Sequence, residues 1–208
     1  MKIAVFGATG TIGHQVVNQA LAQDHQITAL ARNPEKLGLD HDQLTKRAVD
    51  VFDAHQGEEA IAGNDAVIIV LGSAKLTGQV RSVGTRNIIA AMKKLGVKRL
   101  ICQTTLGIGD SKASLNFYWK YLMFGLILRS VYQDHIVQEG LVKNSGLDWT
   151  IVRPAAFTDG PVTEKFYHGF FERGKKLTLT ISRADVAAFI LQELSTSAYL
   201  RKSPGLSY

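Results

Sequence analysis

Seven residues near the N-terminus have the composition and spacing of a turn that binds phosphate. The run Gly7-Ala8-Thr9-Gly10-Thr11-Ile12-Gly13 lies between a short apolar run and a stretch with helical periodicity. In such a turn the first glycine permits a tight bend, the next lets the backbone approach a diphosphate, and the third lets helix pack on strand. The N-terminus of the helix then faces the anion. The spacing predicts a dinucleotide site that includes Gly7, Thr9, Gly10, Thr11, Ile12 and Gly13. The alternative is a glycine-rich turn without a ligand.

The residue after the second apolar run bears on the choice of coenzyme. An acidic residue about 20 positions past the glycines would bind a ribose 2′-hydroxyl and repel a 2′-phosphate. Arg32 occupies that place. A guanidinium can bind phosphate through two charge-assisted hydrogen bonds, so Arg32 predicts that NADP(H) is preferred over NAD(H). An ordinary solvated surface arginine is the other interpretation.

Short β-branched runs alternate with longer segments of helical periodicity, which predicts an α/β fold with a doubly wound parallel sheet flanked by helices. Strands are expected at 3–6, 26–31, 44–49, 66–71, 98–102 and 148–152, and helices from 11, near 56–62, at 78–95, at 131–144 and from 183. Ser182 and Asp185 resemble a capping box at the start of the last helix. We expect residues 1–208 to form a single domain, with a substrate side made by roughly 103–130 and 153–180.

Composition narrows the classes of ligand and location. The chain has 208 residues, 46% of them hydrophobic, and a net charge of +6 that is spread along its length. No basic run is interleaved with aromatics, so a coenzyme with several phosphates is favoured over nucleic acid. Cys102 is the single cysteine, which excludes a disulfide framework and zinc-ligand spacing. The first apolar run is too short for a signal peptide, and residues 117–128 fall short of the roughly 18 that a membrane span needs. We expect a cytoplasmic protein without a metal site or a membrane span.

Several motifs together resemble one family. The spacing GATGTIG resembles the extended and atypical short-chain dehydrogenases/reductases. The segments SGLDWTIVRP at 145–154 and TDGP at 158–161 resemble their NAD(P)-binding, NmrA-like group. Within that group the chain is similar over nearly its whole length to the biliverdin-IXβ reductases, also called flavin reductases, including the stretch Asp134-His135-Ile136. The resemblance implies a Rossmann-type fold and an NAD(P)H-dependent oxidoreductase.

The resemblance also implies further coenzyme-binding positions. Asp50 and Val51 correspond to positions at the adenine edge. Leu71, Gly72 and Ser73 correspond to the strand end that the coenzyme ribose passes. Pro154 ends the sixth strand, and a hydroxyl at the Thr104 position lies beside the nicotinamide, where it could orient the carboxamide or a substrate carbonyl. The alternatives are plain loop residues at 50–51, a strand-exit turn at 71–73 and a turn-forming threonine at 104.

The chain lacks a pair of residues that the main branch of the family uses. None of its tyrosines has a lysine four positions later, so no Tyr-x-x-x-Lys pair is present to protonate a carbonyl oxygen. Reduction of a ketone would leave the developing alkoxide without a proton donor. Flavins and linear tetrapyrroles instead spread the incoming charge over a conjugated system. The sequence therefore predicts an NADPH-dependent reductase of a planar acceptor, a free flavin or a biliverdin-like tetrapyrrole. The alternative is a non-catalytic NADP(H)-binding redox sensor. An epimerase is disfavoured because it normally needs the absent tyrosine.

Three residues are candidates for contact with this acceptor. Thr105 follows the fifth strand, and Arg153 ends the sixth, where it could clamp an acidic substrate tail or form an internal ion pair. Trp119 belongs to the aromatic stretch 117–124, for which three interpretations are open: a packed core helix, a subunit interface or membrane-surface patch, and a lid that stacks on a planar substrate. His135 sits beside an acidic neighbour on a helix, which favours a structural role. Ala156 stands where the biliverdin-IXβ reductases carry a histidine near the substrate, and this weakens any transfer of bilin specificity.

Overall fold

A computed structural model describes residues 1–72, 77–171 and 177–208. Its main sheet has the strand order β3-β2-β1-β4-β5-β6-β10-β8, and every neighbouring pair is parallel except β10 with β8. The strands are β1 (Lys2–Phe6), β2 (Gln26–Ala31), β3 (Leu44–Ala48), β4 (Ala66–Ile69), β5 (Arg99–Gln103), β6 (Asp148–Pro154), β8 (Tyr167–Gly169) and β10 (Gly205–Ser207). The predicted doubly wound α/β fold is confirmed. The prediction for Ser73 lies outside the described residues.

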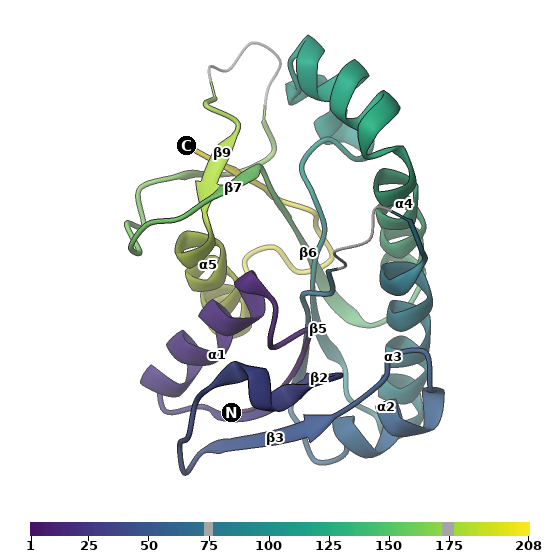
Figure 1. The fold of residues 1–208 in the computed structure, drawn as a ribbon, viewed down its shortest axis with the longest axis vertical. Coiled ribbons are helices and arrows are strands. Elements are labelled where there is room, and N and C mark those ends of the chain that lie inside the picture. The colour runs from purple at the N-terminus through teal and green to yellow at the C-terminus, as the bar shows by residue number, and fades with distance from the viewer. Residues whose placement is uncertain (73–76, 172–176) are drawn as a thin grey trace.

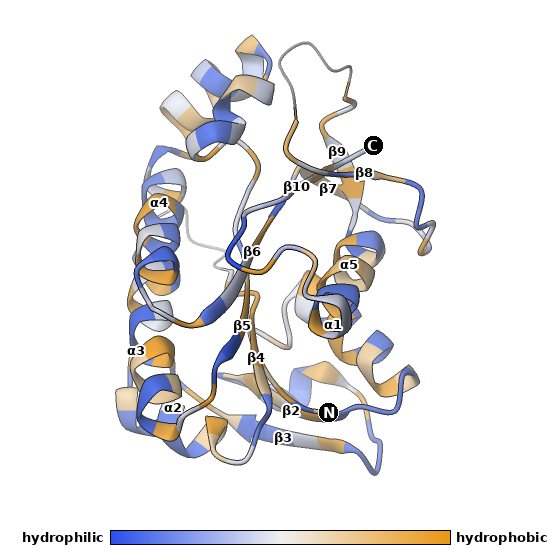
Figure 2. Ribbon diagram, turned by 180° about the vertical axis from the view of Figure 1, so that it is seen from behind, coloured by the Kyte–Doolittle hydropathy of each residue, from blue (hydrophilic) through white to orange (hydrophobic). Residues whose placement is uncertain are grey.

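Helices cover both faces of this sheet (Figure 1). Helices α1 (Thr11–Ala22) and α5 (Arg183–Thr196) pack on one face, and α2 (Ala54–Ile61), α3 (Val80–Leu95) and α4 (Arg129–Lys143) lie on the other. Figure 2 shows both hydrophobic and hydrophilic residues on these helices, while the central strand β4 is hydrophobic. The helices are amphipathic because only one side of each faces the sheet.

The sheet has a hydrophobic core on each face, which explains why its central strands are continuous apolar runs. Ile3 and Val5 of β1 belong to the core beneath α1 and α5, whereas Ala4 and Phe6 belong to the core beneath the other three helices. Successive side chains of a strand point to opposite faces, so a strand covered on both sides is apolar at every position. All four residues of β4 are buried for this reason.

Most element boundaries agree with the sequence patterns, and the exceptions have local causes. Helix α1 begins at Thr11 and β2 spans the predicted residues. Gly96 ends α3 in the left-handed conformation, with φ 73°. Helix α2 begins two residues earlier than predicted because the Asp53 carboxylate accepts hydrogen bonds from the backbone N–H groups of His55 and Gln56. Strand β6 extends two residues further, through Pro154, because β10 pairs with that extension.

The C-terminal tail forms structure that the sequence patterns did not predict. Residues 205–207 insert as β10 between β6 and β8, and β7 (Ala156–Thr158) pairs with β9 (Thr180–Ser182) in a separate small sheet. Ser182 caps α5 as predicted, since its hydroxyl accepts from the Asp185 N–H at 3.0 Å. The Asp185 carboxylate does not accept the reciprocal hydrogen bond from the Ser182 N–H. It accepts hydrogen bonds from Thr163 and from the Tyr208 hydroxyl, the latter at 2.6 Å, and so holds the tail.

The aromatic stretch forms a short helix that extends beyond the sheet past the N-terminus of α4 (Figure 1). This helix, Tyr118–Ile127, has π-type hydrogen bonding and contains no buried residue. The interpretation as a packed core helix is therefore wrong, because none of its residues is buried, although Trp119 is partly buried against the core beneath α1 and α5. Phe117, Tyr118, Tyr121, Leu122, Leu126 and Ile127 are all exposed. None of the described helices is both long and apolar enough to cross a membrane.

Candidate coenzyme and acceptor site

The glycine-rich turn has no room for side chains at its first and last glycines. Gly7 has φ +88°, and a Cβ there would lie 2.5 Å from the carbonyl oxygen of Val70. A Cβ on Gly13 would overlap the carbonyl oxygen of Gly7. Gly10 donates its N–H to the Gly7 carbonyl at 2.9 Å and is the N-cap of α1, where no side chain caps the helix. The uncapped N–H groups of α1 are thus left for a ligand, which fits the phosphate of a dinucleotide.

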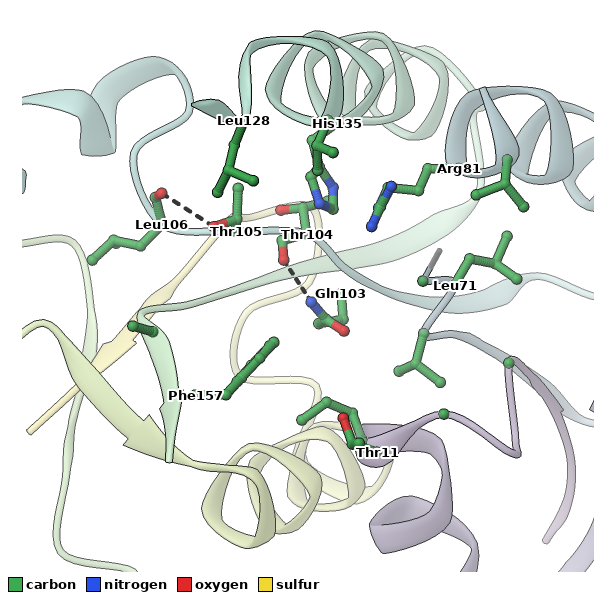
Figure 3. A pocket seen from close by; sticks show the side chains of 18 of the residues that line it. Thr11, Leu71, Arg81, Gln103, Thr104, Thr105, Leu106, Leu128, His135 and Phe157 are labelled. Atoms are coloured by element: carbon green, nitrogen blue, oxygen red, sulfur yellow. Dashed lines mark hydrogen bonds between the residues drawn. The ribbon is translucent and has the colours of Figure 1, made fainter. Parts of the chain in front are cut away.

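A cavity of about 790 Å³ begins at this turn and runs along the carboxyl ends of the parallel strands. Open parallel sheets bind ligands at this edge. Of the predicted coenzyme residues, those that line the cavity are Gly7, Thr9, Gly10, Thr11, Ile12, Arg32, Val51, Leu71, Gly72 and Thr104. Thr105 and Trp119, predicted on the acceptor side, line it as well. Figure 3 shows how side chains from several elements converge on this space.

Four predicted site residues do not border the cavity. Gly13 packs beneath the turn, where its role is steric. The exposed Asp50 uses its carboxylate to accept a hydrogen bond from the N–H of Phe52 at 3.0 Å. Pro154 is buried in the sheet opposite Leu206 of β10, and its carbonyl accepts from the N–H of Leu106. Asp50 and Pro154 support the surrounding loops through these bonds, and their contact with the coenzyme stays a prediction.

Arg153 is the fourth, and the structure corrects its predicted role in binding substrate. Its side chain is fully buried, and its Nε and Nη2 atoms donate to the two carboxylate oxygens of Glu139 at 2.8 and 2.7 Å. Its Nη1 atom donates to Asp110 at 2.7 Å. Burial alone would lower the pKa of Arg153, but these carboxylates raise it above its ordinary value. Of the two interpretations, the internal ion pair is the one observed, because the carboxylates of Glu139 and Asp110 engage the guanidinium on both sides.

This ion pair also orients Thr104. The Thr104 hydroxyl donates to Glu139 Oε1 at 2.9 Å, and the residue is 1% exposed. Its hydrogen is already used, so the oxygen can accept a hydrogen bond from a carboxamide N–H but cannot donate one to a substrate carbonyl. Of the two roles considered for Thr104, only the first fits. The neighbouring Thr105 hydroxyl donates to the Leu106 carbonyl (Figure 3).

Arg32 and Arg81 are the cationic side chains among the described lining residues. Arg32 follows β2, and no other described side chain is paired with its guanidinium. Arg81 lies in the first turn of α3 and was not predicted as a site residue. A signal was present in the sequence, because a cation at a helix N-terminus opposes the helix dipole and so calls for a functional explanation.

His135 also lines the cavity, although its position on a helix favoured a structural role. Its Nδ1–H donates to Gln138 Oε1 at 3.0 Å, and Gln138 Nε2 donates to the Thr85 hydroxyl. Burial and the nearby Arg81 lower the pKa of His135 to about 4. The imidazole is therefore neutral at pH 7, with Nε2 as a hydrogen-bond acceptor. The buried hydrogen bond of His135 to Gln138 agrees with a structural role. Because His135 also lines the cavity, it can contact a bound ligand as well.

The far end of the cavity is apolar and aromatic. Leu106, Leu115, Trp119, Phe124, Leu128 and Phe157 line it. Trp119 and Phe124 come from the exposed helix 118–127, and their rings lie 5.8 Å apart. The described lining residues include no carboxylate, lysine, cysteine or tyrosine. Tyr132 lies nearby, but its hydroxyl donates to the Gly107 carbonyl at 2.9 Å and burial raises its pKa.

The doubly wound sheet and its glycine-rich turn define a Rossmann-type dinucleotide-binding protein. The chain belongs to the NAD(P)H-binding family, which it matches over residues 7–197. It is 30% identical to the UPF0659 protein YMR090W of Saccharomyces cerevisiae over 93% of this chain and 87% of the relative. Quinone oxidoreductase 2 of Escherichia coli is 28% identical over 95% of this chain, which spans 65% of that protein. Among solved structures, ChuY, an anaerobillin reductase from Escherichia coli O157:H7, is 26% identical with a TM-score of 0.81, covering 99% of this chain and 96% of its own.

Proposed function

We propose that this protein is an NADPH-dependent reductase that transfers hydride to a planar conjugated acceptor, such as a free flavin or a biliverdin-like tetrapyrrole. The observation that carries the proposal is one continuous cavity, which joins the phosphate-binding turn to an aromatic end without an acidic side chain among the described lining residues. NADPH supplies the hydride when bound. The protein binds the coenzyme, orients both molecules and shields them from water.

The coenzyme half is supported by complementary charge. The uncapped N-terminus of α1 would hold the coenzyme diphosphate, and Arg32 at the end of β2 would hold a 2′-phosphate. The Thr104 oxygen would accept a hydrogen bond from the nicotinamide carboxamide, because its own hydrogen is donated to Glu139. These residues would favour the binding of NADPH over that of NADH.

The acceptor half is suited to a flat molecule. Trp119, Phe124 and Phe157 offer ring surfaces, and each aromatic contact adds on the order of 1 kcal/mol beyond area burial. Since the site offers no tuned proton donor among its described residues, it favours acceptors that spread charge and then take a proton from solvent. A quinone is also a planar conjugated acceptor, so the similarity to a quinone oxidoreductase supports the same class.

The test is NADPH oxidation by the purified protein with a panel of acceptors: FMN, FAD, riboflavin, biliverdin and quinones, against simple aldehydes and ketones. We expect turnover with at least one conjugated acceptor and none with the simple carbonyls. Tight NADPH binding without any turnover would contradict the reductase and leave the redox-sensor alternative. Turnover of simple ketones alone would contradict the proposed acceptor class.

A further inference from the structure

Arg81 is a buried cation at the N-terminal end of α3. It lies in the first turn of α3, where a cation opposes the helix dipole, and its side chain is 10% exposed. Burial lowers its pKa, although Asp134 offsets part of this effect. Removing a charged group from water costs free energy unless a partner compensates. A partner is therefore expected for the guanidinium.

Asp134 is the nearby carboxylate, and its hydrogen-bonding needs are already met. It accepts from the backbone N–H groups of Arg81 and Ser82 at 3.1 and 3.0 Å, and from the Ser82 hydroxyl at 2.5 Å. The guanidinium Nη1 atom lies 3.8 Å from Asp134, beyond hydrogen-bond distance. The Arg81 Nε atom is buried without a hydrogen-bond partner among the described residues. Asp134 thus caps α3 and leaves the guanidinium incompletely paired.

The guanidinium points into the cavity. In Figure 3 Arg81 extends from the α3 wall beside His135 and Leu71, and Thr11 at the N-terminus of α1 lies on the opposite side. His135 is neutral, so it does not compete with Arg81 for an anion. No carboxylate lines the described part of the cavity to neutralise Arg81 from within.

We propose that Arg81 forms an anion subsite that binds a phosphate or carboxylate oxygen of the bound ligand, a step that rests on the proposed function. The diphosphate of the coenzyme is one source, because the N-terminus of α1 faces Arg81 across the cavity. A phosphate or carboxylate on the acceptor is the other source. In either case the ligand would add a hydrogen-bonded anion to the long ion pair that Arg81 makes with Asp134.

The first arm measures coenzyme binding alone, by titrating NADPH fluorescence without any acceptor. If the coenzyme diphosphate is the source, Arg81→Met should weaken NADPH binding roughly 10- to 100-fold, the range for a lost charge-assisted hydrogen bond. Arg81→Lys keeps the charge but not the planar fork, so it should lose less. If Arg81→Met fails to fold, Arg81→Lys provides the test of NADPH affinity. Adenosine 2′,5′-bisphosphate, which lacks the nicotinamide half, should lose less affinity than NADPH.

Arg99→Lys is the matched control. Arg99 is similarly buried and has an unpartnered Nε, but its Nη atoms donate to Asp148, Thr150 and Glu193 outside the cavity. It should lower the melting temperature without changing NADPH affinity. This separates a stability effect from loss of the subsite.

The second arm compares FMN with riboflavin, which differ by one phosphate. If the acceptor is the source, Arg81→Lys should reduce the preference for FMN in KM while NADPH affinity stays unchanged. The subsite is overturned if the Arg81 variants change neither NADPH affinity nor this preference and only lower the melting temperature, as Arg99→Lys does. Absence of turnover would contradict the reductase but would leave the NADPH titration as an independent test.

Discussion

Arg32 is the residue on which the choice of coenzyme depends. Its guanidinium borders the cavity at the end of β2, where an acidic residue would repel a 2′-phosphate. Arg32→Asp should reverse the preference from NADPH to NADH, because one phosphate–guanidinium contact contributes about 1.5 to 3 kcal/mol. Titration of both coenzymes with both proteins measures this. Equal affinities in the unmodified protein would contradict the prediction.

His135 should make stability depend on pH. Its pKa is lowered from 6.5 to about 4 in the folded protein, with burial as the main cause. As the pH falls below 6.5, the unfolded chain takes up the proton first, so stability is lost between about pH 6.5 and 4. The free energy of unfolding should fall by about 2 kcal/mol between pH 7 and 5 from this group. Urea unfolding at the two pH values measures it.

His135→Gln should remove this part of the pH dependence, because the amide does not titrate. The control is His55→Gln, since the His55 side chain is 80% exposed and its substitution should leave the dependence unchanged. An identical fall in stability for all three proteins would show that His135 is not the group responsible.

At the scale of elements, the aromatic stretch has two remaining interpretations, a lid and a subunit interface or membrane-surface patch. Trp119 and Phe124 line the cavity while the helix contains no buried residue, which favours a lid. Trp119→Ala should raise the apparent KM for flavin roughly fivefold, because one aromatic contact contributes on the order of 1 kcal/mol. The melting temperature should fall only modestly, because Trp119 is only partly buried against the core. Steady-state kinetics and thermal unfolding measure the two effects.

Phe117→Ala is the control for this helix, since Phe117 is 78% exposed and does not line the cavity. It should change neither KM nor melting temperature. If Trp119→Ala instead cost roughly 3 to 5 kcal/mol of stability, Trp119 would be a core side chain and the lid would be wrong.

At the scale of the whole molecule, Arg153 joins segments that are distant in sequence. It connects β6 to Glu139 of α4 and to Asp110 in the short 3-10 helix Gly109–Ser114 that follows β5. Burial raises the pKa of Glu139, but Arg153 and Lys143 lower it overall, so the carboxylate is charged at pH 7. Arg153→Met should therefore cost about 3 to 5 kcal/mol, because it leaves that charge buried without its main partner.

Lys143→Met provides the comparison, because Lys143 also pairs with Glu139 but its side chain is 40% exposed. Its loss should cost less than about 1 kcal/mol. The double variant Arg153→Met with Glu139→Gln should recover part of the stability. Urea unfolding of the three variants measures these differences. If an Arg153 variant kept its stability but showed a raised KM, Arg153 would bind substrate and the structural role would be wrong.

The sequence by itself determined the sheet-and-helix alternation, the phosphate-binding turn and the position of Arg32. These depend on local causes: apolar periodicity, the lack of space for a Cβ at Gly7 and Gly13, and chain order within a strand–turn–helix unit. Only the tertiary structure decided that Arg153 is an internal ion-pair partner, that Arg81 and His135 border the ligand space, and that the C-terminal tail enters the sheet. Those outcomes depend on which distant segments pack together, because a charged side chain binds whichever partner the fold brings within reach.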